Sequence, residues 1–565
     1  MNGAQALVEM LKAYQVCHIF GVPGDTTVPF YDALYDAQAD LQHILARDER
    51  SAAFMADAYA RLSSKPGVCE GPSGGGATFM LPGVAEACGS SVPIIALTSD
   101  NALSFEEKGA LTALDQRSLF RPVTKWNVLV KRAEMIPDLV RRAFRMATSG
   151  RPGAVHMALP KDVLEEESQG STVYAETQCA SCPAYRSCAD AGELDRAADL
   201  LLHARRGVIV AGGGAVLSGA WEALTSLADM LAMPVGTTIN GKGSIAEDHP
   251  LSIGVVGGNG GRAYANRIVQ EADLVFYVGS KVNYVDSANW TVPDRGRPPK
   301  IIQLDIDPSE LGNNYPIAVG LCGDARLTLE SLCELLGREA RPKEGRAEDI
   351  ARRAAEWWAQ VDAKAGSDAV PIRPQRVIRE LQDALPPDAV VVADPGTPTP
   401  FVAAQFKVRE PGRKILIPRA HGALGYAIPG VVGAKVARPD ACVVGLCGDG
   451  SFAMSAGDLA SIKRLGEPLV LINFNNGCYG WIKMLQKLHY GGRYFSVDFD
   501  EGIDYVTVAQ GFGLRCFRVQ HAGELRGMIQ EALHVPGPAF IDVPTAYEGE
   551  EVPPVDSWLR TVERS

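Results

Sequence analysis

The feature that most constrains the fold is a strand–helix–strand pattern in the last third of the chain. Apolar residues predict strands over 441–446 and 468–474, and a helical stretch lies between them at about 456–465. Asp449 follows the first strand and Asn476 follows the second. Because parallel strands of such a βαβ unit end at the same edge of a sheet, both side chains are expected where open α/β sheets bind ligands.

The residues around these two side chains favour a site for a metal ion and a diphosphate. Gly448, Gly450 and Gly477 let the backbone approach a diphosphate closely. A carboxylate such as Asp449, together with substrate phosphates, is the usual way in which proteins hold Mg²⁺. The alternative is an ordinary turn in which Asp449 only caps the following helix. We favour the metal site because both halves occur in one βαβ unit.

With this motif the chain resembles the thiamine diphosphate-dependent enzymes, in which Gly-Asp-Gly, a spacer of nearly this length and Asn-Asn form the magnesium–diphosphate motif. The resemblance implies that Asp449 and Asn476 are metal ligands and that the backbone carbonyl of Cys478 is the third protein ligand. It also implies cofactor contacts from other loops of the chain. The implied cofactor-binding residues are Gly24, Gly396, Thr397, Gly422, Leu424, Gly448, Asp449, Gly450, Ser451, Asn476 and Cys478.

Three other segments carry the resemblance further. In this family a bulky apolar residue between the two cofactor rings forces a bent cofactor, and Leu424 stands at that place, with Gly422 near the aminopyrimidine ring. Residues 394–399 resemble the loop that covers the diphosphate. Residues 20–25 resemble the strand-end loop on the substrate side of the thiazolium ring.

Glu49 is the predicted catalytic residue. It precedes a helix predicted over 51–61. In thiamine diphosphate enzymes a glutamate before such a helix contacts the aminopyrimidine ring, so the resemblance implies that Glu49 assists loss of the proton from the thiazolium carbon. A carboxyl group in a dry crevice is expected to have a raised pKa. The alternative is a glutamate favoured at a helix N-terminus only by the helix dipole.

The chain divides into three α/β units joined by polar segments. Strands alternate with helices in residues 1–164, 193–340 and 370–550, which predicts three domains, each built on a mostly parallel sheet flanked by helices. By the resemblance these are a pyrimidine-binding, a central Rossmann-like and a diphosphate-binding domain. The polar residues 165–192 and the charged residues 338–353 are interpreted as linkers, the second of which leads into a helix.

Composition and charge argue against several classes of partner. The 565 residues carry a net charge of −12 and the pI is near 5.4, which disfavours nucleic acid or an anionic membrane. The first residues lack the pattern of a signal peptide, and no apolar run reaches the roughly 20 residues of a membrane span. A cytoplasmic protein is therefore expected. Cys179, Cys182 and Cys188 form a cluster that we interpret as linker rather than zinc site, because no second pair or histidine is near.

The order of the domains is similar to that of the acetolactate synthase, pyruvate oxidase and pyruvate decarboxylase group, and the nearest likeness is to acetolactate synthase large subunits. The chain departs from them on the substrate side. Leu111 and Thr112 stand where they carry Phe-Gln, and Trp481 stands where they carry Met. The residues predicted to line the substrate pocket are Asp25, Thr26, Leu111, Thr112, His421 and Trp481.

The resemblance implies an enzyme that makes or breaks carbon–carbon bonds with thiamine diphosphate and Mg²⁺. The expected reaction is decarboxylation of a 2-oxo acid and ligation of the product to a carbonyl acceptor. Cleavage of a 2-hydroxy ketone or a 2-hydroxyacyl-CoA is the alternative, since residues 114–116 and 124–126 resemble benzaldehyde lyase. A homodimer or homotetramer is expected, because in this family the cofactor lies between two subunits.

Two other classes of protein are disfavoured. A nicotinamide dehydrogenase would need the GxGxxG fingerprint, which the glycine turn at 212–214 lacks. A non-catalytic cofactor-binding protein would not need Glu49, Asp449 and Asn476 together. Central domains of the group bind FAD or ADP in some members, and no specific flavin signal stands out in this sequence.

Overall fold

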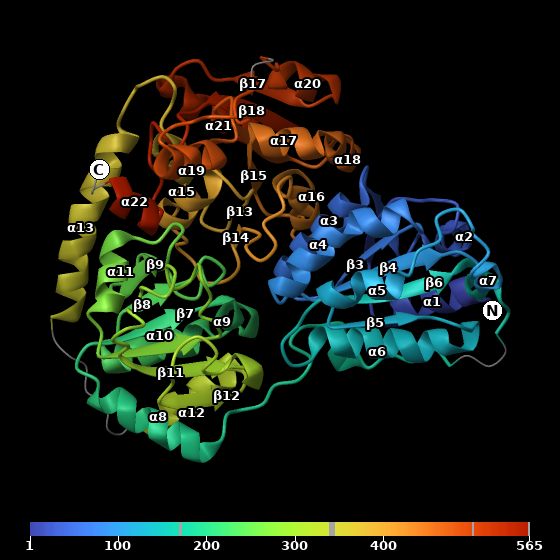
Figure 1. Cartoon of the computed structure of the whole chain (residues 1–565), viewed down its shortest axis with the longest axis horizontal. Helices are drawn as coiled ribbons and strands as arrows, with labels where there is room; N and C mark the ends of the chain where they lie inside the picture. The colour runs from blue at the N-terminus through green and yellow to red at the C-terminus, as the bar shows by residue number, and fades with distance from the viewer. Residues whose placement is uncertain (169–171, 338–344, 500–501, 563–565) are drawn as a thin grey trace. The chain divides into compact units, whose positions relative to one another are not determined.

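The computed structural model describes residues 1–168, 172–337, 345–499 and 502–562. Within these residues the chain forms three sheets of six strands each (Figure 1), and all paired neighbours run parallel. Helices flank each sheet, as the alternation of strands and helices in the sequence predicts. The predicted fold class, α/β with three mostly parallel sheets, is confirmed.

The first sheet has the strand order β2-β1-β3-β4-β6-β5. Its strand β3, with the sequence GVCEG, is buried along its whole length, as is usual for parallel strands covered on both faces. The strand order changes direction between β1 and β3. The strands are β1 (His18–Gly21), β2 (Gln42–Leu45), β3 (Gly67–Gly71), β4 (Ile94–Asp100), β5 (Trp126–Leu129) and β6 (Val155–Pro160). The helices are α1 (Gly3–Ala13), α2 (Val28–Ala37), α3 (Glu49–Ser63), α4 (Gly75–Gly89), α5 (Gln116–Phe120), α6 (Ile136–Thr148) and α7 (Lys161–Glu165).

Helix α3 carries the predicted catalytic residue at its first position. Asp48 caps the helix, because its side chain accepts a hydrogen bond from the backbone N–H of Arg50. Nearly all residues of α3 are buried, since the helix packs against α4 and against α16 (Ala427–Ala437). Gly433 allows the close approach of α16, because a Cβ there would overlap the carbonyl oxygen of Met55.

The middle sheet has the strand order β12-β11-β10-β7-β8-β9. Its strands β7, β10 and β11 are apolar runs whose apolar residues are buried. The strands are β7 (Gly207–Ala211), β8 (Val235–Thr237), β9 (Ser252–Val255), β10 (Leu274–Val278), β11 (Lys300–Asp305) and β12 (Val319–Cys322). The helices are α8 (Ala191–His203), α9 (Gly213–Ser218), α10 (Trp221–Leu231), α11 (Ala263–Gln270) and α12 (Ala325–Leu336).

The second predicted linker, residues 338–353, is partly wrong, because its second half is helical in the structure. Helix α13 (Arg346–Ala365) begins inside the charged stretch, while residues 338–344 lie outside the described part of the chain. Charge in this stretch supports the helix rather than a linker. Asp349 pairs with Arg352 at 2.6 Å and with Arg353 at 3.0 Å, at the (i, i+3) and (i, i+4) spacings that stabilise helices.

The third sheet has the strand order β14-β13-β15-β16-β18-β17 and contains the predicted βαβ unit. The strands are β13 (Val390–Ala393), β14 (Ile415–Leu416), β15 (Val443–Gly448), β16 (Leu469–Asn475), β17 (Arg515–Arg518) and β18 (Pro538–Pro544). The helices that follow α13 are α14 (Pro374–Ala384), α15 (Pro398–Gln405), α16, α17 (Asp449–Ser455), α18 (Leu459–Leu465), α19 (Gly480–Tyr490), α20 (Tyr505–Gly511), α21 (Leu525–Leu533) and α22 (Asp556–Val562).

The connection inside this βαβ unit contains more helical residues than the sequence predicts. The predicted helix at about 456–465 corresponds to a short 3-10 turn, Ala456–Asp458, followed by α18. Helix α17 already begins at Asp449, where the glycines on both sides of the aspartate favoured a turn. The aspartate therefore occupies the first helical position, where a carboxylate is favourable to the helix dipole.

The chain folds into two compact units made of discontinuous segments. The first unit contains residues 1–185, 418–441 and 453–467, and so includes the first sheet together with α16 and α18. The second unit contains the remaining residues, with the middle and third sheets. None of the helices in the described ranges combines the length and apolarity that crossing a bilayer requires.

Candidate active site

Four neighbouring strands of the third sheet end at one edge, and the loops that leave them carry the predicted metal and diphosphate residues. Strands β13, β15, β16 and β18 are adjacent in the sheet. Thr397 follows β13, Asp449 begins the helix after β15, Asn476 follows β16, and Glu548 follows β18. The change of strand order between β13 and β15 makes this edge the expected place for a ligand.

Asp449 joins the two halves of the sequence motif. Its Oδ2 accepts hydrogen bonds from the backbone N–H groups of Asn476 at 3.1 Å and Gly477 at 2.7 Å, and its Oδ1 accepts one from Gly450 at 2.8 Å. Burial nevertheless raises the pKa of Asp449 to about 6. A cation bound to this carboxylate would compensate for the water that burial removes.

Asn476 and its neighbours supply further oxygen atoms. The Oδ1 atom of Asn476 accepts a hydrogen bond from the backbone N–H of Cys478 at 3.3 Å, and its Nδ2 donates to Thr397 Oγ1 at 3.2 Å. Thr397 in turn donates to Glu548, whose pKa burial raises to about 7. One carboxylate ligand, an amide oxygen and a backbone carbonyl fit a hard cation such as Mg²⁺, which commonly completes its shell with phosphate oxygens and water.

The glycines of these loops leave space beside the predicted metal ligands. A Cβ on Gly448 or Gly396 would meet no atom within 4 Å. Gly396 has a φ of +109°, a conformation that favours glycine. Gly450 instead lies against an aromatic ring, since a Cβ there would be 2.7 Å from Tyr479, and Ser451 is buried beside it. The open backbone at Gly396 and Gly448 fits the close approach of a diphosphate.

In the first unit, the side chain of Glu49 is buried at the start of α3. Only 8% of the residue is exposed. Two glycines border its side chain: a Cβ on Gly71 would lie 3.1 Å from Glu49 Cγ, and a Cβ on Gly76 would lie 2.9 Å from Glu49 Oε1. Burial is the main cause that raises the pKa of Glu49, and the negative charges of Asp48 and Glu70 raise it further.

Glu70 is a second buried carboxyl group whose charge acts on Glu49. It lies on β3, accepts a hydrogen bond from the hydroxyl of Tyr31, and is 3.5 Å from Nε2 of His43. Tyr31 also contacts His43, with 2.9 Å between the hydroxyl oxygen and Nε2. Burial raises the pKa of Glu70, while its contacts with His43 and Tyr31 oppose that effect. Glu70 is therefore a polar, titratable neighbour whose negative charge affects Glu49.

Four hydroxyl groups gather at the carboxyl ends of β1, β3 and β4. Thr26 Oγ1 lies 2.6 Å from Ser99 Oγ and 3.3 Å from Ser73 Oγ, and Ser73 lies 2.7 Å from Thr112 Oγ1. The predicted pocket residues Thr26 and Thr112 therefore meet in one cluster. Leu111 is 84% exposed next to it. Gly24 and Asp25 lie in the loop that leads to Thr26, and a Cβ on Gly24 would overlap Pro72.

The segment 419–426, which carries His421, Gly422 and Leu424, is held at both ends by buried carboxylates of the first unit. Glu86 on α4 accepts hydrogen bonds from the backbone N–H groups of Arg419 at 2.9 Å and His421 at 2.8 Å. At the other end, the hydroxyl of Tyr426 donates to Asp57 of α3 at 2.6 Å. The guanidinium of Arg61 bridges Asp57 and Glu86.

The predicted residues thus form two groups, one in each unit. In the first unit lie Gly24, Asp25, Thr26, Glu49, Leu111, Thr112, His421, Gly422 and Leu424. In the second unit lie Gly396, Thr397, Gly448, Asp449, Gly450, Ser451, Asn476, Cys478 and Trp481. Trp481 packs on Trp558 of α22, with 4.3 Å between ring centroids.

Sequence reasoning missed four buried carboxylates of these groups: Asp57, Glu70, Glu86 and Glu548. A charged residue inside the otherwise apolar strand β3 was a signal for Glu70. Glu86 resembles any polar residue of a helix, and Glu548 stands near the acidic Glu550 and Glu551. No pattern in the sequence therefore marks either residue as a buried site residue. Their partners come from distant parts of the chain.

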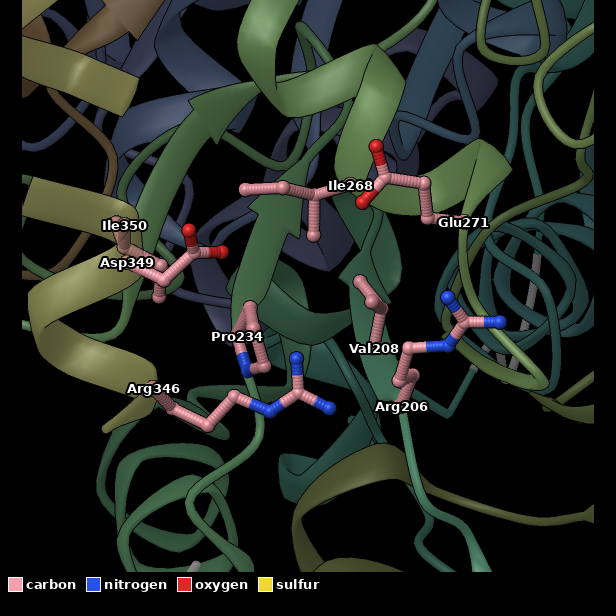
Figure 2. A pocket seen from close by; sticks show the side chains of 8 residues that line it. All are labelled: Arg206, Val208, Pro234, Ile268, Glu271, Arg346, Asp349 and Ile350. Atoms are coloured by element: carbon pink, nitrogen blue, oxygen red, sulfur yellow. The ribbon is translucent and has the colours of Figure 1, made fainter. Parts of the chain in front are cut away.

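A small hollow lies on the middle sheet (Figure 2). Its lining includes Arg206 and Pro234, which stand just before β7 and β8, and Arg346 and Asp349 of α13. The hollow therefore opens at the amino ends of these strands, opposite the edge where parallel sheets bind ligands. None of the predicted site residues lines it.

Three family models of thiamine pyrophosphate enzymes match the chain; thiamine pyrophosphate is another name for thiamine diphosphate. The N-terminal TPP-binding domain matches residues 1–119, the central domain matches residues 194–332, and the C-terminal TPP-binding domain matches residues 394–543.

Curated relatives match along nearly the whole chain. A probable acetolactate synthase large subunit of Methanocaldococcus jannaschii is 37% identical over 552 residues, covering 96% of this chain and 92% of that protein. The acetolactate synthase of Arthrospira platensis is 33% identical over 557 residues, covering 96% of this chain and 94% of that protein. The acetolactate synthase isozyme 3 large subunit of Escherichia coli K12 is 30% identical over 583 residues, covering 100% of both chains.

Proposed function

The chain belongs to the thiamine pyrophosphate enzyme family and is a thiamine diphosphate-dependent enzyme of the acetolactate synthase group, and from this premise we propose that it decarboxylates a 2-oxo acid and ligates the product to a carbonyl acceptor. The observation that carries the proposal is the hydrogen bonding of Asp449 to the backbone of Asn476 and Gly477. These bonds join the two halves of the motif at one sheet edge, as a metal–diphosphate site requires. The names of the relatives support the choice of reaction.

The proposed metal is Mg²⁺, held by one carboxylate oxygen of Asp449, Oδ1 of Asn476 and the backbone carbonyl of Cys478. The open backbone at Gly396 and Gly448 would receive the diphosphate. Bound thiamine diphosphate supplies the carbon centre that stabilises negative charge at a carbonyl carbon, which the side chains of the protein cannot do.

Glu49 is proposed to hold and move a proton at its carboxyl oxygens. Burial and the neighbouring Asp48 and Glu70 raise its pKa, so that it keeps a proton at a higher pH than an exposed glutamate. Gly71 and Gly76 border the side chain closely, and the capped N-terminus of α3 fixes its backbone. Its position therefore suits repeated transfer of one proton to and from the same ring atom.

The hydroxyl cluster of Thr26, Ser73 and Thr112 is proposed to bind the carboxylate of the 2-oxo acid, because hydroxyl groups can donate hydrogen bonds to it. Leu111, Asp25, His421 and Trp481 stay predictions for the substrate pocket. The domain limits 1–164, 193–340 and 370–550, the homodimer or homotetramer and the cytoplasmic location also stay predictions.

The test of this function is a CO₂-release assay on the full chain with thiamine diphosphate and Mg²⁺. Pyruvate and a panel of other 2-oxo acids are offered, and products are identified by mass spectrometry. Release of CO₂ together with acetolactate or another acyloin is the expected result. If no 2-oxo acid releases CO₂ while 2-hydroxy ketones or 2-hydroxyacyl-CoA thioesters are cleaved, the proposed reaction is wrong and the enzyme is a lyase.

A further inference from the structure

The side chain of Glu548 has no part in the function proposed above, although it lies beside the proposed metal ligands. Only 1% of the residue is exposed. Its Oε1 accepts a hydrogen bond from Thr397 Oγ1 at 2.6 Å, and its Oε2 is buried with no hydrogen-bond partner within the ranges that the structure describes. A Cβ on Gly480 would overlap Oε2 and would lie 2.9 Å from Nδ2 of Asn476. The carboxylate and the amide nitrogen therefore meet over Gly480.

When Glu548 is ionised, the hydrogen bonds from Asn476 to Glu548 can run in only one direction. An ionised carboxylate only accepts hydrogen bonds, and a threonine hydroxyl has a single proton. The proton of Thr397 is therefore donated to Glu548, and the hydroxyl oxygen is left to accept from its other neighbour. That neighbour is Asn476, at 3.2 Å. Of the two ends of its amide group, only the nitrogen can donate.

This direction fixes which way the Asn476 amide points. Its nitrogen faces Thr397 and Glu548, so its oxygen faces the other way, where it accepts from the backbone N–H of Cys478 at 3.3 Å. The same oxygen is the proposed metal ligand. An amide turned by half a rotation would present a nitrogen with two protons to the cation, which cannot coordinate it. Orientation of the amide thus decides whether Asn476 is a ligand.

We propose that Glu548 is a positioning residue that acts through Thr397 to hold the Asn476 amide with its oxygen toward the metal ion, an inference that rests on the proposed metal site. Glu548 lies on the nitrogen side of the amide, so it acts on the ligand and does not bind the metal itself. Mg²⁺ needs near-ideal octahedral geometry, which makes its affinity sensitive to the direction of each ligand. Partners of this kind typically change metal affinity by about 10–100-fold when they are removed.

The test measures metal affinity directly rather than activity. Mn²⁺ replaces Mg²⁺, because it takes similar oxygen ligands and its binding can be followed by electron paramagnetic resonance. The full chain is titrated with Mn²⁺ in the presence of thiamine diphosphate. Thr397→Val removes the hydroxyl group that links Glu548 to Asn476. In Glu548→Gln the direction of the hydrogen bonds is no longer fixed, because the glutamine amide both donates and accepts. Both variants are expected to bind Mn²⁺ about 10–100-fold more weakly.

Two variants serve as controls for folding and for charge. Thr397→Ser keeps the hydroxyl and is expected to retain the affinity of the unchanged protein. Glu550→Gln removes a carboxylate two positions away on the exposed side of the same loop and is expected to change nothing. The double variant Glu548→Gln/Thr397→Val is expected to be no weaker than Thr397→Val alone, because both residues belong to one hydrogen-bonded chain. Far-UV circular dichroism checks that each variant is folded.

The inference is overturned if Thr397→Val and Glu548→Gln bind Mn²⁺ as tightly as the unchanged protein. It is also overturned if Glu548→Gln weakens binding and Thr397→Val does not, because Glu548 would then act without Thr397. Failure of the proposed metal site looks different: the unchanged protein itself would bind no Mn²⁺ with thiamine diphosphate, and Asp449→Asn would make no difference.

Discussion

At the scale of single residues, the surroundings of Glu49 and His156 illustrate two opposite effects of burial. Burial raises the pKa of the Glu49 carboxyl and lowers that of the His156 imidazole, to about 3. In both cases the neutral form is favoured, because a charge loses its hydration in the interior. For Glu49 this effect serves the proposed proton transfer. For His156, which stacks on Phe120 with 3.8 Å between ring centroids, it makes stability depend on pH.

Replacing Glu49 with Gln should lower kcat by about 10²–10⁴-fold, the usual contribution of a positioned acid–base group. Glutamine fills the same space between Gly71 and Gly76 but cannot transfer the proton. Steady-state kinetics with the best 2-oxo acid would measure the loss, and thermal unfolding would check the fold. A Glu49→Gln variant with full activity would show that this residue is not the proton-transfer group.

His156 should make the protein less stable as the pH falls below the ordinary histidine range. Above pH 6.5, the ordinary pKa value, the ring is neutral in both the folded and the unfolded chain, so its contribution is complete. Between about pH 6.5 and 3 the unfolded chain binds a proton that the folded chain refuses, and stability falls by about 1.4 kcal/mol per pH unit. Urea unfolding of the protein and of His156→Gln across this range would measure the difference in slope. Parallel profiles for the two proteins would contradict the prediction.

At the scale of secondary-structure elements, the loop from β3 into α4 sets the position of Glu49. Gly76 is the second residue of α4, and a Cβ there would lie 2.5 Å from Pro72 Cδ and 2.9 Å from Glu49 Oε1. Its neighbour Gly75, the first residue of the same helix, has no atom within 4 Å of a Cβ. Two adjacent glycines therefore differ in what surrounds them.

Gly76→Ala should lower kcat by about 10²-fold, because a displacement of about 1 Å at a reacting group has an effect of that size. Gly75→Ala is the matched control and should keep near-full activity, with a gain in stability of at most about 1 kcal/mol from better helix propensity. Kinetics and thermal unfolding of the two variants give the comparison. Equal losses of activity in both would mean that contact with Glu49 is not the cause.

Some helices and strands could be predicted from the sequence, and others could not. The βαβ unit around Asp449 and the strands of the middle sheet could be predicted, since buried parallel strands are apolar runs separated by helical patterns. The start of α17 at Asp449 could not, because flanking glycines favour turns in isolated sequence. The carboxylate contacts of Glu86 with the segment 419–426 could not either. They join residues more than 300 positions apart, and no local pattern records such a pair.

At the scale of the whole molecule, a buried ionic cluster connects the middle and third sheets within the second unit. Glu247 pairs with both Lys242 and Arg262, and all three are buried. Lys242 also donates to the backbone oxygen of Ala403, at 3.1 Å, and Arg262 to that of Ala404, at 2.8 Å. Both oxygens belong to α15, so the cluster ties the loops of the middle sheet to a helix of the third.

Glu247→Gln should destabilise the protein by about 3–5 kcal/mol, because it leaves two buried cations without their anion. Glu271→Gln is the control: it removes one of the two acidic partners of Arg353, in an ion pair at 3.0 Å whose glutamate is 40% exposed, and should cost less than about 1 kcal/mol. Thermal and urea unfolding would compare the two. A loss below 1 kcal/mol for Glu247→Gln would mean that the cluster is not needed for stability.

The discontinuous make-up of the first unit has a consequence for synthesis of the protein. Its opening segment ends at Tyr185, but its last segment, 453–467, follows only after most of the second unit has been translated. At roughly 5–20 residues per second, the ribosome needs about 15–60 s to cover that interval. For most of that time, until residues 427–437 have been made, the face of α3 that packs on α16 lacks that helix. The nascent protein is therefore expected to need protection from aggregation until translation has passed residue 467.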